Sequence, residues 1–263
     1  MPKIHETAIV HPGAELADDV EIQPFSIIEA EVVLGPGCII GPHCVIGKGT
    51  VMGANNRTFS GAQIGIPPQD LKHLSDRAGK TMIGDGNTFR ETVTVSSSTV
   101  YAGDTEEKST RIGNNCLFMA CVHIAHDCTV GNQVIMANNS ALAGHVEIHD
   151  GAILGGLVGI HQFCRIGTMA FIGGMARVNM DALPFMITEG HPARCYGPNV
   201  VGLNRAGLSK DSVSLIRRMF KLLYRSGLNT SQAVQEIVQS IEDCHEKTVL
   251  LDFITGSGRG IVH

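Results

Sequence analysis

The stretch CVHIAHDCTV, residues Cys121–Val130, lies at the centre of a hexapeptide repeat. An apolar residue recurs at every sixth position from Ile112 to Val178, and two positions before each stands a small or β-branched residue. A helix repeats its faces about every 3.6 residues and a strand at every second residue, so this period is typical of neither. The pattern predicts a solenoid of short strands joined by turns, with one large and one small side chain per face pointing inward.

The same repeat opens the chain, from Ile4 to Ile64. It stops at a Pro-Pro pair, and the polar, aperiodic residues 67–80 predict a loop that leaves the stack. A second excursion at residues 96–109 interrupts the repeat again. We therefore predict a parallel β-helix over residues 1–190 that carries two projecting loops.

Helical periodicity replaces the hexapeptide pattern near the C-terminus. Because the apolar faces of these helices cannot be buried by the helices alone, we expect them to pack on the solenoid or on a neighbouring subunit. Residues 191–263 are predicted to form a helical C-terminal domain. Its helices are expected from a cap at Ser209 or Asp211 to about Arg225, from a cap at Thr230 or Ser231 onward, and over about Lys247–Thr255.

Composition excludes several classes of protein. A chain of 263 residues with 43% apolar content can bury a substantial core. The formal net charge of -5 gives no overall bias toward nucleic acid. No apolar run approaches the roughly 18 residues of a membrane span, and the N-terminus lacks the apolar segment of a signal peptide. We expect a cytoplasmic protein.

The cysteines are predicted to be structural. Several of the eight cysteines occupy the small inward position of the repeat, where a thiol is a compact apolar filler. Reduced thiols are the default in a cytosolic protein, so neither disulfides nor a zinc site is expected. These inward cysteines are Cys38, Cys44, Cys116, Cys128 and Cys164.

A column of polar residues follows from the coil geometry. Three hexapeptides form one triangular coil, so residues 18 apart stack on neighbouring coils, about 4.8 Å apart as in any parallel sheet. This rule places Gly144 and then Gln162 above His126. The adjacent column contains Asp127, His145 and Phe163, with His123 and His161 close by.

The column indicates acyl-transfer chemistry. A neutral histidine such as His126 is the usual general base for a hydroxyl group, and Asp127 could hold its tautomer. The N–H of Gly144 could stabilise an oxyanion. No serine or cysteine nucleophile stands in the column, so the hydroxyl would attack the acyl carbonyl directly. The alternatives are a metal site, as in zinc hydratases of the same fold, and a non-catalytic scaffold or binding module.

Four motifs carry a family resemblance, and it extends over essentially the whole chain. The chain resembles the acyl-carrier-protein:UDP-N-acetylglucosamine O-acyltransferases, which act first in lipid A synthesis. The resemblance implies a left-handed helix, a homotrimer with active sites between subunits, transfer of an (R)-3-hydroxyacyl group to the sugar 3-hydroxyl, and no metal or redox cofactor. The motifs are HIAHDCTVGN at His123–Asn132, LAGHV at Leu142–Val146, HQFCRIG at His161–Gly167 and YRSG at Tyr224–Gly227.

The resemblance also implies roles for individual residues. His126 would be the general base, Asp127 its support and Gly144 N–H the oxyanion donor. The motif Gln69-Asp70-Leu71-Lys72 would reach substrate across the trimer interface. Residues lining the sugar and acyl site would be His123, His145, His161 and Gln162; Asn199 and Arg205 would contact the nucleotide, and Gly174 would limit acyl length.

Some of these residues have alternative interpretations. Asn199 could cap a short helix, and Gly174 could be a turn glycine. A basic strip on the first long helix could dock an acidic acyl carrier protein or be a solvated face. Ser96 and Val201 depart from the family pattern, which leaves an N-acyltransferase acting on a 3-amino UDP-sugar as the alternative function. The strip consists of Arg217, Arg218, Lys221 and Arg225.

Overall fold

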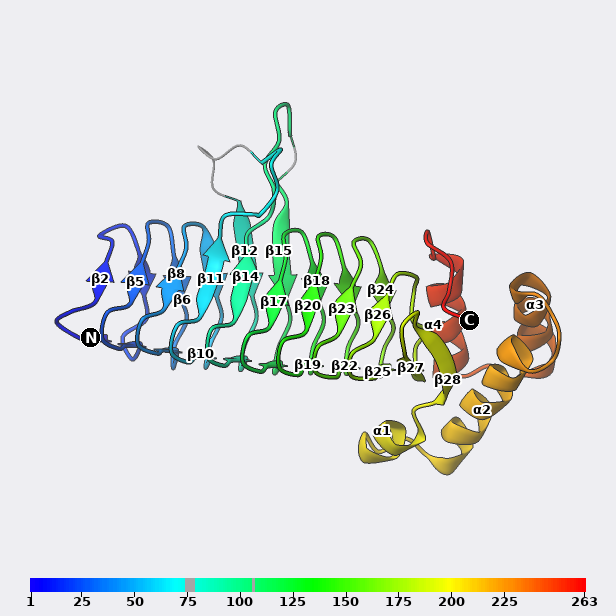
Figure 1. Cartoon of the computed structure of the whole chain (residues 1–263). Helices are drawn as coiled ribbons and strands as arrows, with labels where there is room; N and C mark the ends of the chain where they lie inside the picture. Colours follow the sequence, from blue (N-terminus) through cyan, green and yellow to red (C-terminus); the bar gives the residue numbers. More distant parts are fainter. Residues whose placement is uncertain (74–78, 106) are drawn as a thin grey trace.

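The computed structural model describes residues 1–73, 79–105 and 107–263 (Figure 1). The chain folds as the predicted left-handed parallel β-helix, followed by helices at its C-terminal end. Successive short strands pass to different faces of a three-sided stack, and every third strand returns to the same sheet in the uninterrupted coils. The predicted fold class is therefore confirmed.

Three sheets form the faces, and we name them A, B and C. Sheet A contains β1 (Lys3–Ile4), β4 (Glu21–Ile22), β7 (Ile39–Ile40), β10 (Arg57–Thr58), β13 (Thr88–Phe89), β16 (Leu117–Phe118), β19 (Ile135–Met136), β22 (Ile153–Leu154), β25 (Phe171–Ile172), β27 (Met186–Glu189) and β28 (Arg194–Pro198). Sheet B contains β2 (Ile9–Val10), β5 (Ile27–Ile28), β8 (Val45–Ile46), β11 (Gln63–Ile66), β14 (Thr94–Ser96), β17 (His123–Ile124), β20 (Ala141–Leu142), β23 (Gly159–Ile160) and β26 (Arg177–Val178). Sheet C contains β3 (Glu15–Leu16), β6 (Val33–Leu34), β9 (Thr50–Met52), β12 (Lys80–Ile83), β15 (Ser109–Ile112), β18 (Thr129–Val130), β21 (Glu147–Ile148) and β24 (Arg165–Ile166).

The 18-residue register holds wherever the repeat is uninterrupted. Ile124 pairs with Leu142, for example, in a parallel ladder. Across the loops the spacing changes: Thr58 pairs with Phe89, and Val95 pairs with Ile124. The fixed spacing is therefore wrong for contacts between coils on opposite sides of a loop, where the intervening chain adds to the distance in sequence.

The interior contains the predicted pairs of large and small side chains. Ile124 and Val122 are both fully buried, and the equivalent pairs from residues 20 and 22 to residues 176 and 178 are buried as well, whereas the first coil is partly exposed. The five inward cysteines are free and buried, as predicted. Cys128 lies with its Sγ 3.2 Å from the carbonyl oxygen of Ala143, and burial raises the pKa of its thiol to about 12. These thiols are fillers of a dry core.

The corners between sheets B and C use left-handed backbone conformations. Asp127, His145 and Phe163 have φ angles of 58°, 61° and 64°, and they occupy equivalent positions on successive coils. Residues other than glycine, asparagine and aspartate rarely adopt this left-handed region, so packing in the stack must hold His145 and Phe163 in it. The corner aligns these three side chains in a column.

Two loops leave the stack side by side (Figure 1). The first loop follows β11, and its described residues are 67–73 and 79. The second loop lies between β14 and β15, at residues 97–108. They contact each other where the Tyr101 hydroxyl donates to Asp70 Oδ2 at 2.9 Å. This contact holds the start of the first loop against the second.

The C-terminal region begins with the antiparallel pair β27 and β28. Ser209 caps the second helix, as predicted, whereas Asn229 caps the third through a capping box with Gln232, in place of Thr230 or Ser231. The sequence indicated the first helix only as the short helix that Asn199 could cap, and Asn199 does cap it. The helices are α1 (Val200–Arg205), α2 (Lys210–Tyr224), α3 (Thr230–Ser240) and α4 (His245–Thr255). The division into domains at residue 190 stays a prediction.

The helical region is fastened to the end of the stack. Arg165 in β24 donates from Nη1 to the carbonyl oxygen of Phe253 at 3.1 Å, and its guanidinium lies 4.3 Å from the centre of the Phe253 ring. The last residues return to the stack, where Asp181 and Ile261 form a parallel bridge. Within the described ranges, no helix has the length and apolarity needed to cross a bilayer.

Candidate active site

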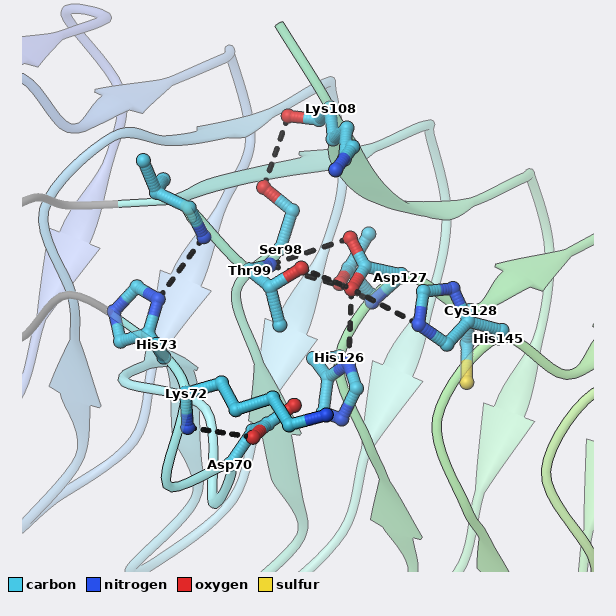
Figure 2. Close-up of polar contacts among 12 residues, drawn as sticks. Asp70, Lys72, His73, Ser98, Thr99, Lys108, His126, Asp127, Cys128 and His145 are labelled. Carbon is cyan, nitrogen blue, oxygen red and sulfur yellow. Dashed lines mark hydrogen bonds and ion pairs between the residues drawn. The ribbon is translucent and has the colours of Figure 1, made fainter. Parts of the chain in front are cut away.

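The centre of the site is a histidine–carboxylate pair at a corner of the stack (Figure 2). His126 Nδ1 lies 2.8 Å from Asp127 Oδ2. An ionised carboxylate can only accept hydrogen bonds, so Nδ1 carries a proton, and in the neutral ring the lone pair is then on Nε2. This tautomer makes His126 Nε2 a proton acceptor.

The environment of Asp127 keeps it ionised. Burial alone would raise the pKa of the carboxyl group, but the hydrogen bonds from His126 and Thr99 outweigh this desolvation and leave the pKa below its ordinary value. The nearby His145 ring favours the carboxylate further. The pair therefore fits a general base with a charged partner.

Gly144 lies directly against the His126 ring. A Cβ atom built on Gly144 would be 2.7 Å from His126 Nε2, closer than real Cβ contacts. Only glycine fits here without displacing the ring. Within the part of the chain that the structure describes, the Gly144 N–H takes part in no hydrogen bond. The predicted base and the predicted oxyanion donor are thus adjacent.

His145 and Phe163 continue the column above Asp127. The His145 ring stacks on the Phe163 ring at 4.7 Å and meets the His126 ring edge-on at 5.3 Å. Burial lowers the pKa of His145, which favours the uncharged ring near neutral pH. The structure therefore brings Asp127, His145 and Phe163 together beside His126, as the 18-residue rule placed them.

A cavity of about 380 Å³ opens beside this column, on sheet B. His123 lines it and has its Nδ1 2.8 Å from Thr94 Oγ1, and burial lowers the pKa of this ring as well. Ser96 is buried at the cavity, and its hydroxyl has no hydrogen-bond partner among the described residues. The lining residues are Gln69, Ser96, His123, Ala125, His126, Ala141, Leu142, Ala143, Gly144, Gly159 and Ile160.

The first loop lies at the site of its own chain. Gln69 lines the same cavity as His126. Asp70 accepts hydrogen bonds from the Tyr101 hydroxyl and, at 2.8 Å, from the backbone N–H of Lys72. These bonds lower the pKa of the Asp70 carboxyl. The predicted reach of this loop across a subunit interface stays a prediction.

His161 and Gln162 are less enclosed than the other predicted residues. Both are exposed on the coil above Gly144, and His161 Nδ1 lies 3.2 Å from the Gln162 carbonyl oxygen. Gly174 is also exposed, and a Cβ built there would lie 3.3 Å from the Gly156 carbonyl oxygen. None of these three residues lines the cavity around His126.

Asn199 and Arg205 lie at a different cavity, of about 530 Å³, with Val201. This cavity lies over sheet A, beside Phe171, and so on another face of the stack from His126. Asn199 caps α1: it accepts from Gly202 N at 3.1 Å and donates to the Met169 carbonyl oxygen at 3.0 Å. Within one chain, the two cavities are not brought together.

The basic strip lies on the exposed face of α2. Two of its residues also make local contacts: Arg218 donates to the Ser240 carbonyl oxygen at 3.0 Å, and the Arg225 guanidinium lies 5.9 Å from the centre of the Phe220 ring. Arg225 further lines a cavity with Arg194. The charges of the strip remain accessible to a partner.

The structure adds residues that the sequence did not indicate. The Thr99 hydroxyl donates to Asp127 Oδ2 at 2.7 Å, and the Asp127 N–H donates to Thr110 Oγ1 at 2.9 Å. Thr99 precedes its partner by 28 residues, because the second loop lies between them. An 18-residue rule could not find it.

Three residues of the site also form a group of side chains of the kinds that bind metal ions. One ligand atom from each of His126, Asp127 and His145 lies within 4.8 Å of the others. Both rings contact the same carboxylate oxygen, with His145 Nε2 at 3.7 Å from Asp127 Oδ2. An ion held by all three would have to replace the His126–Asp127 hydrogen bond.

Comparison with known proteins places the chain in a family. A model of bacterial transferase hexapeptides (six repeats) matches residues 13–48 and 109–144, which places the chain in the class of hexapeptide-repeat transferases. The second-domain model of UDP-N-acetylglucosamine O-acyltransferases matches residues 181–262. The chain belongs to the UDP-N-acetylglucosamine O-acyltransferase family.

Full-length relatives support the assignment. The chain is 46% identical to the acyl-(acyl-carrier-protein)–UDP-N-acetylglucosamine O-acyltransferase of Syntrophobacter fumaroxidans, over 99% of both chains. It is 43% identical to that of Saccharophagus degradans over 100% of both. The solved structure of the Francisella novicida UDP-N-acetylglucosamine acyltransferase is similar with a TM-score of 0.94, 37% identity, and coverage of 98% of this chain and 93% of that one.

Gly144→Ala should abolish most of the activity. The added methyl group would displace the His126 ring, and a misplacement of about 1 Å can cost about 100-fold in rate. Steady-state kinetics of the purified variant would check this. Gly258→Ala, where an added Cβ meets nothing within 4 Å, is the matched control. Near-normal turnover by Gly144→Ala would contradict the placement of the ring.

Proposed function

We propose that the chain transfers an (R)-3-hydroxyacyl group from acyl carrier protein to the 3-hydroxyl of UDP-N-acetylglucosamine, the first step of lipid A synthesis. The relatives carry the name of this O-acyltransferase activity. The observation that carries the proposal is the placement of His126 Nε2 against Gly144, at a cavity lined by Gln69 and His123. A proton acceptor and a peptide N–H at one point are what direct acyl transfer requires.

The mechanism follows from these positions. His126 Nε2 takes the proton of the sugar hydroxyl as its oxygen attacks the thioester carbonyl carbon. Asp127 stabilises the imidazolium that forms, and the Gly144 N–H donates to the tetrahedral oxyanion. Collapse of this intermediate breaks the carbon–sulfur bond, and His126 returns the proton to the leaving thiolate. No covalent enzyme intermediate is needed.

Other residues of the site would bind and orient substrate. His123 and His145 are kept uncharged by burial, so they suit hydrogen bonding to sugar hydroxyls. Gln69, Asp70 and Lys72 would contact the acceptor from the first loop. Further predicted contacts are His161 and Gln162 for sugar and acyl chain, Asn199 and Arg205 for the nucleotide, and Gly174 for the end of the acyl chain.

A homotrimer would complete the site. The His126 cavity lies on sheet B and the Arg205 cavity over sheet A, so one chain cannot present both to a single nucleotide sugar. Packing sheet B of one subunit beside sheet A of the next would bring them together. Threefold repetition of this contact closes a ring.

Two further expectations complete the proposal. We expect the reaction in the cytoplasm, since free buried thiols fit a reducing compartment. We also expect no metal or redox cofactor to take part, because the residues around His126 supply the base and the oxyanion donor themselves.

His126→Ala should lower turnover about 100- to 10,000-fold, because the general base is lost. The measurement is mass spectrometry of the product formed from a mixture of acyl carrier protein thioesters with UDP-N-acetylglucosamine or its 3-amino analogue. The proposal expects an ester of the first acceptor. If an amide forms on the 3-amino analogue and no ester forms, the chain is an N-acyltransferase and the proposed O-acyl transfer is wrong. Full activity of His126→Ala would contradict the role of His126 as the general base.

Shared sites predict complementation between inactive variants. His126→Ala and Arg205→Ala subunits, denatured together and refolded as mixed trimers, should regain activity, since some interfaces then contain both intact residues. Each variant refolded alone provides the baseline. If activity never exceeds the sum of the two baselines, each chain contains a complete site and the trimer argument is wrong.

Charge reversal on α2 should weaken the use of the carrier-bound donor. The double variant Arg217→Glu/Lys221→Glu should raise KM for the acyl carrier protein thioester by about tenfold at low salt, because steering of an acidic partner is lost. The rate with a pantetheine thioester that lacks the protein should not change. Lys210→Glu, on the same helix, is the control. An unchanged KM would contradict docking of the carrier protein on the strip and would indicate that the strip is only a solvated face.

A further inference from the structure

Three consecutive residues of the second loop each hold a different part of the site, and Figure 2 shows the contacts of the first of them, Thr99. Thr99 donates to Asp127 from its hydroxyl and its backbone. The Val100 N–H donates to His73 Nδ1 at 3.0 Å. The Tyr101 hydroxyl donates to Asp70. We call residues Thr99–Tyr101 the bracket segment, because it joins the catalytic pair to the first loop.

Thr99 fixes the orientation of the Asp127 carboxylate. Its Oγ1 lies 2.7 Å from Oδ2, and its N–H lies 3.2 Å from Oδ1 and 3.3 Å from Oδ2. His126 Nδ1 approaches the same Oδ2 at 2.8 Å. Thr99 is only 1% exposed, so water cannot replace its hydroxyl group. The same oxygen, Oδ2, is therefore held both by Thr99 and by the ring that it supports.

The other end of the bracket segment holds the first loop. Asp70 is bonded to the Tyr101 hydroxyl, and its neighbour Gln69 lines the cavity with His126. His73 is tied to the backbone of the segment as well. A shift of the loop at these points acts on the same short stretch of chain that holds Asp127.

We propose that Thr99 is a positioning residue for the His126–Asp127 pair, and that the bracket segment couples the seating of the first loop to the orientation of the Asp127 carboxylate. This inference rests on the proposed function for its kinetic consequences only. When Gln69 and its neighbours engage the acceptor, the Asp70–Tyr101 contact keeps the segment in place, and Thr99 keeps Oδ2 directed at His126 Nδ1.

The sign of the pH effect follows from the hydrogen bonds. Without the Thr99 hydroxyl, Oδ2 has one donor fewer and becomes a better acceptor for a protonated His126 ring. The imidazolium is then stabilised, so the His126 ring is already protonated at a higher pH than in the wild type. Because a protonated ring cannot act as the base, the acid limb of the pH profile of kcat/KM shifts to higher pH. Among the described residues, the titratable groups that interact with Asp127 and its two rings are Tyr101, Asp104, Lys108, Asp70, His123 and Cys128.

The first test compares Thr99→Val with Thr99→Ser. Valine keeps the shape of threonine and removes the hydroxyl group, so kcat should fall about 10- to 100-fold with KM nearly unchanged, and the acid limb should shift to higher pH. Serine restores the donor and should recover most of kcat. Equal losses in both variants, or a loss of kcat without a shift of the limb, would overturn the positioning role.

A readout independent of activity separates this inference from the proposed function. The pKa of His126 can be followed by NMR in the intact protein, and it should rise in Thr99→Val but not in Thr99→Ser. If the wild-type protein transfers no acyl group, the proposed function fails while this titration still tests the contact. An unchanged His126 titration in Thr99→Val would refute it.

Coupling through the segment is tested with Tyr101→Phe. This change removes the bond to Asp70 without touching Asp127, and it should still move the acid limb in the same direction as Thr99→Val, with a higher KM for the acceptor. Tyr196→Phe, on an exposed tyrosine outside the site, should change neither. A normal acid limb in Tyr101→Phe would show that the loop and the catalytic pair act separately.

Discussion

The interior of the coil admits one large and one small side chain per face, and the rest of the structure depends on this packing. Pairs such as Val122 and Ile124 fill the interior completely, so each strand is held in a single register. A strand shifted by one residue would turn its apolar side chain outward. Fixed registers in turn keep the corner residues in vertical columns. The column of Asp127, His145 and Phe163 is thus a product of core packing.

The site shows how such a rigid wall is adapted to chemistry. The corner supplies His126 with a glycine against its ring, and the carboxylate beside it is kept ionised by hydrogen bonds that outweigh its burial. The first loop adds to this wall, since its Gln69 lines the same cavity as His123 and His126 while Asp70 is anchored to Tyr101. The coils therefore fix the position of the catalytic pair, and the first loop completes the lining of the cavity.

Much of the fold and part of the site could be predicted because they follow from periodicity. The buried cysteines and the stacking of His126 near Gly144 are read from positions in the repeat. Thr99 could not be found this way, because a loop of arbitrary length separates it from Asp127. Asn229 was missed as a cap because the adjacent threonine and serine are equally good caps in sequence. The short helix α1 contains too few residues to show a periodic pattern.

The way in which the strands re-enter the stack has a further consequence. Thr58 pairs with Phe89 and Val95 pairs with Ile124 as regularly as strands on consecutive coils, whatever the length of the chain between them. Loop length is therefore decoupled from core packing, since insertions there leave every buried neighbour unchanged. The exposed parts of these two segments can therefore be lengthened or shortened without any cost in interior fit, whereas Thr99 and Tyr101 are fixed by their contacts with the site. The residues that the first loop presents at the cavity can vary in the same way while the wall that carries His126 stays unaltered.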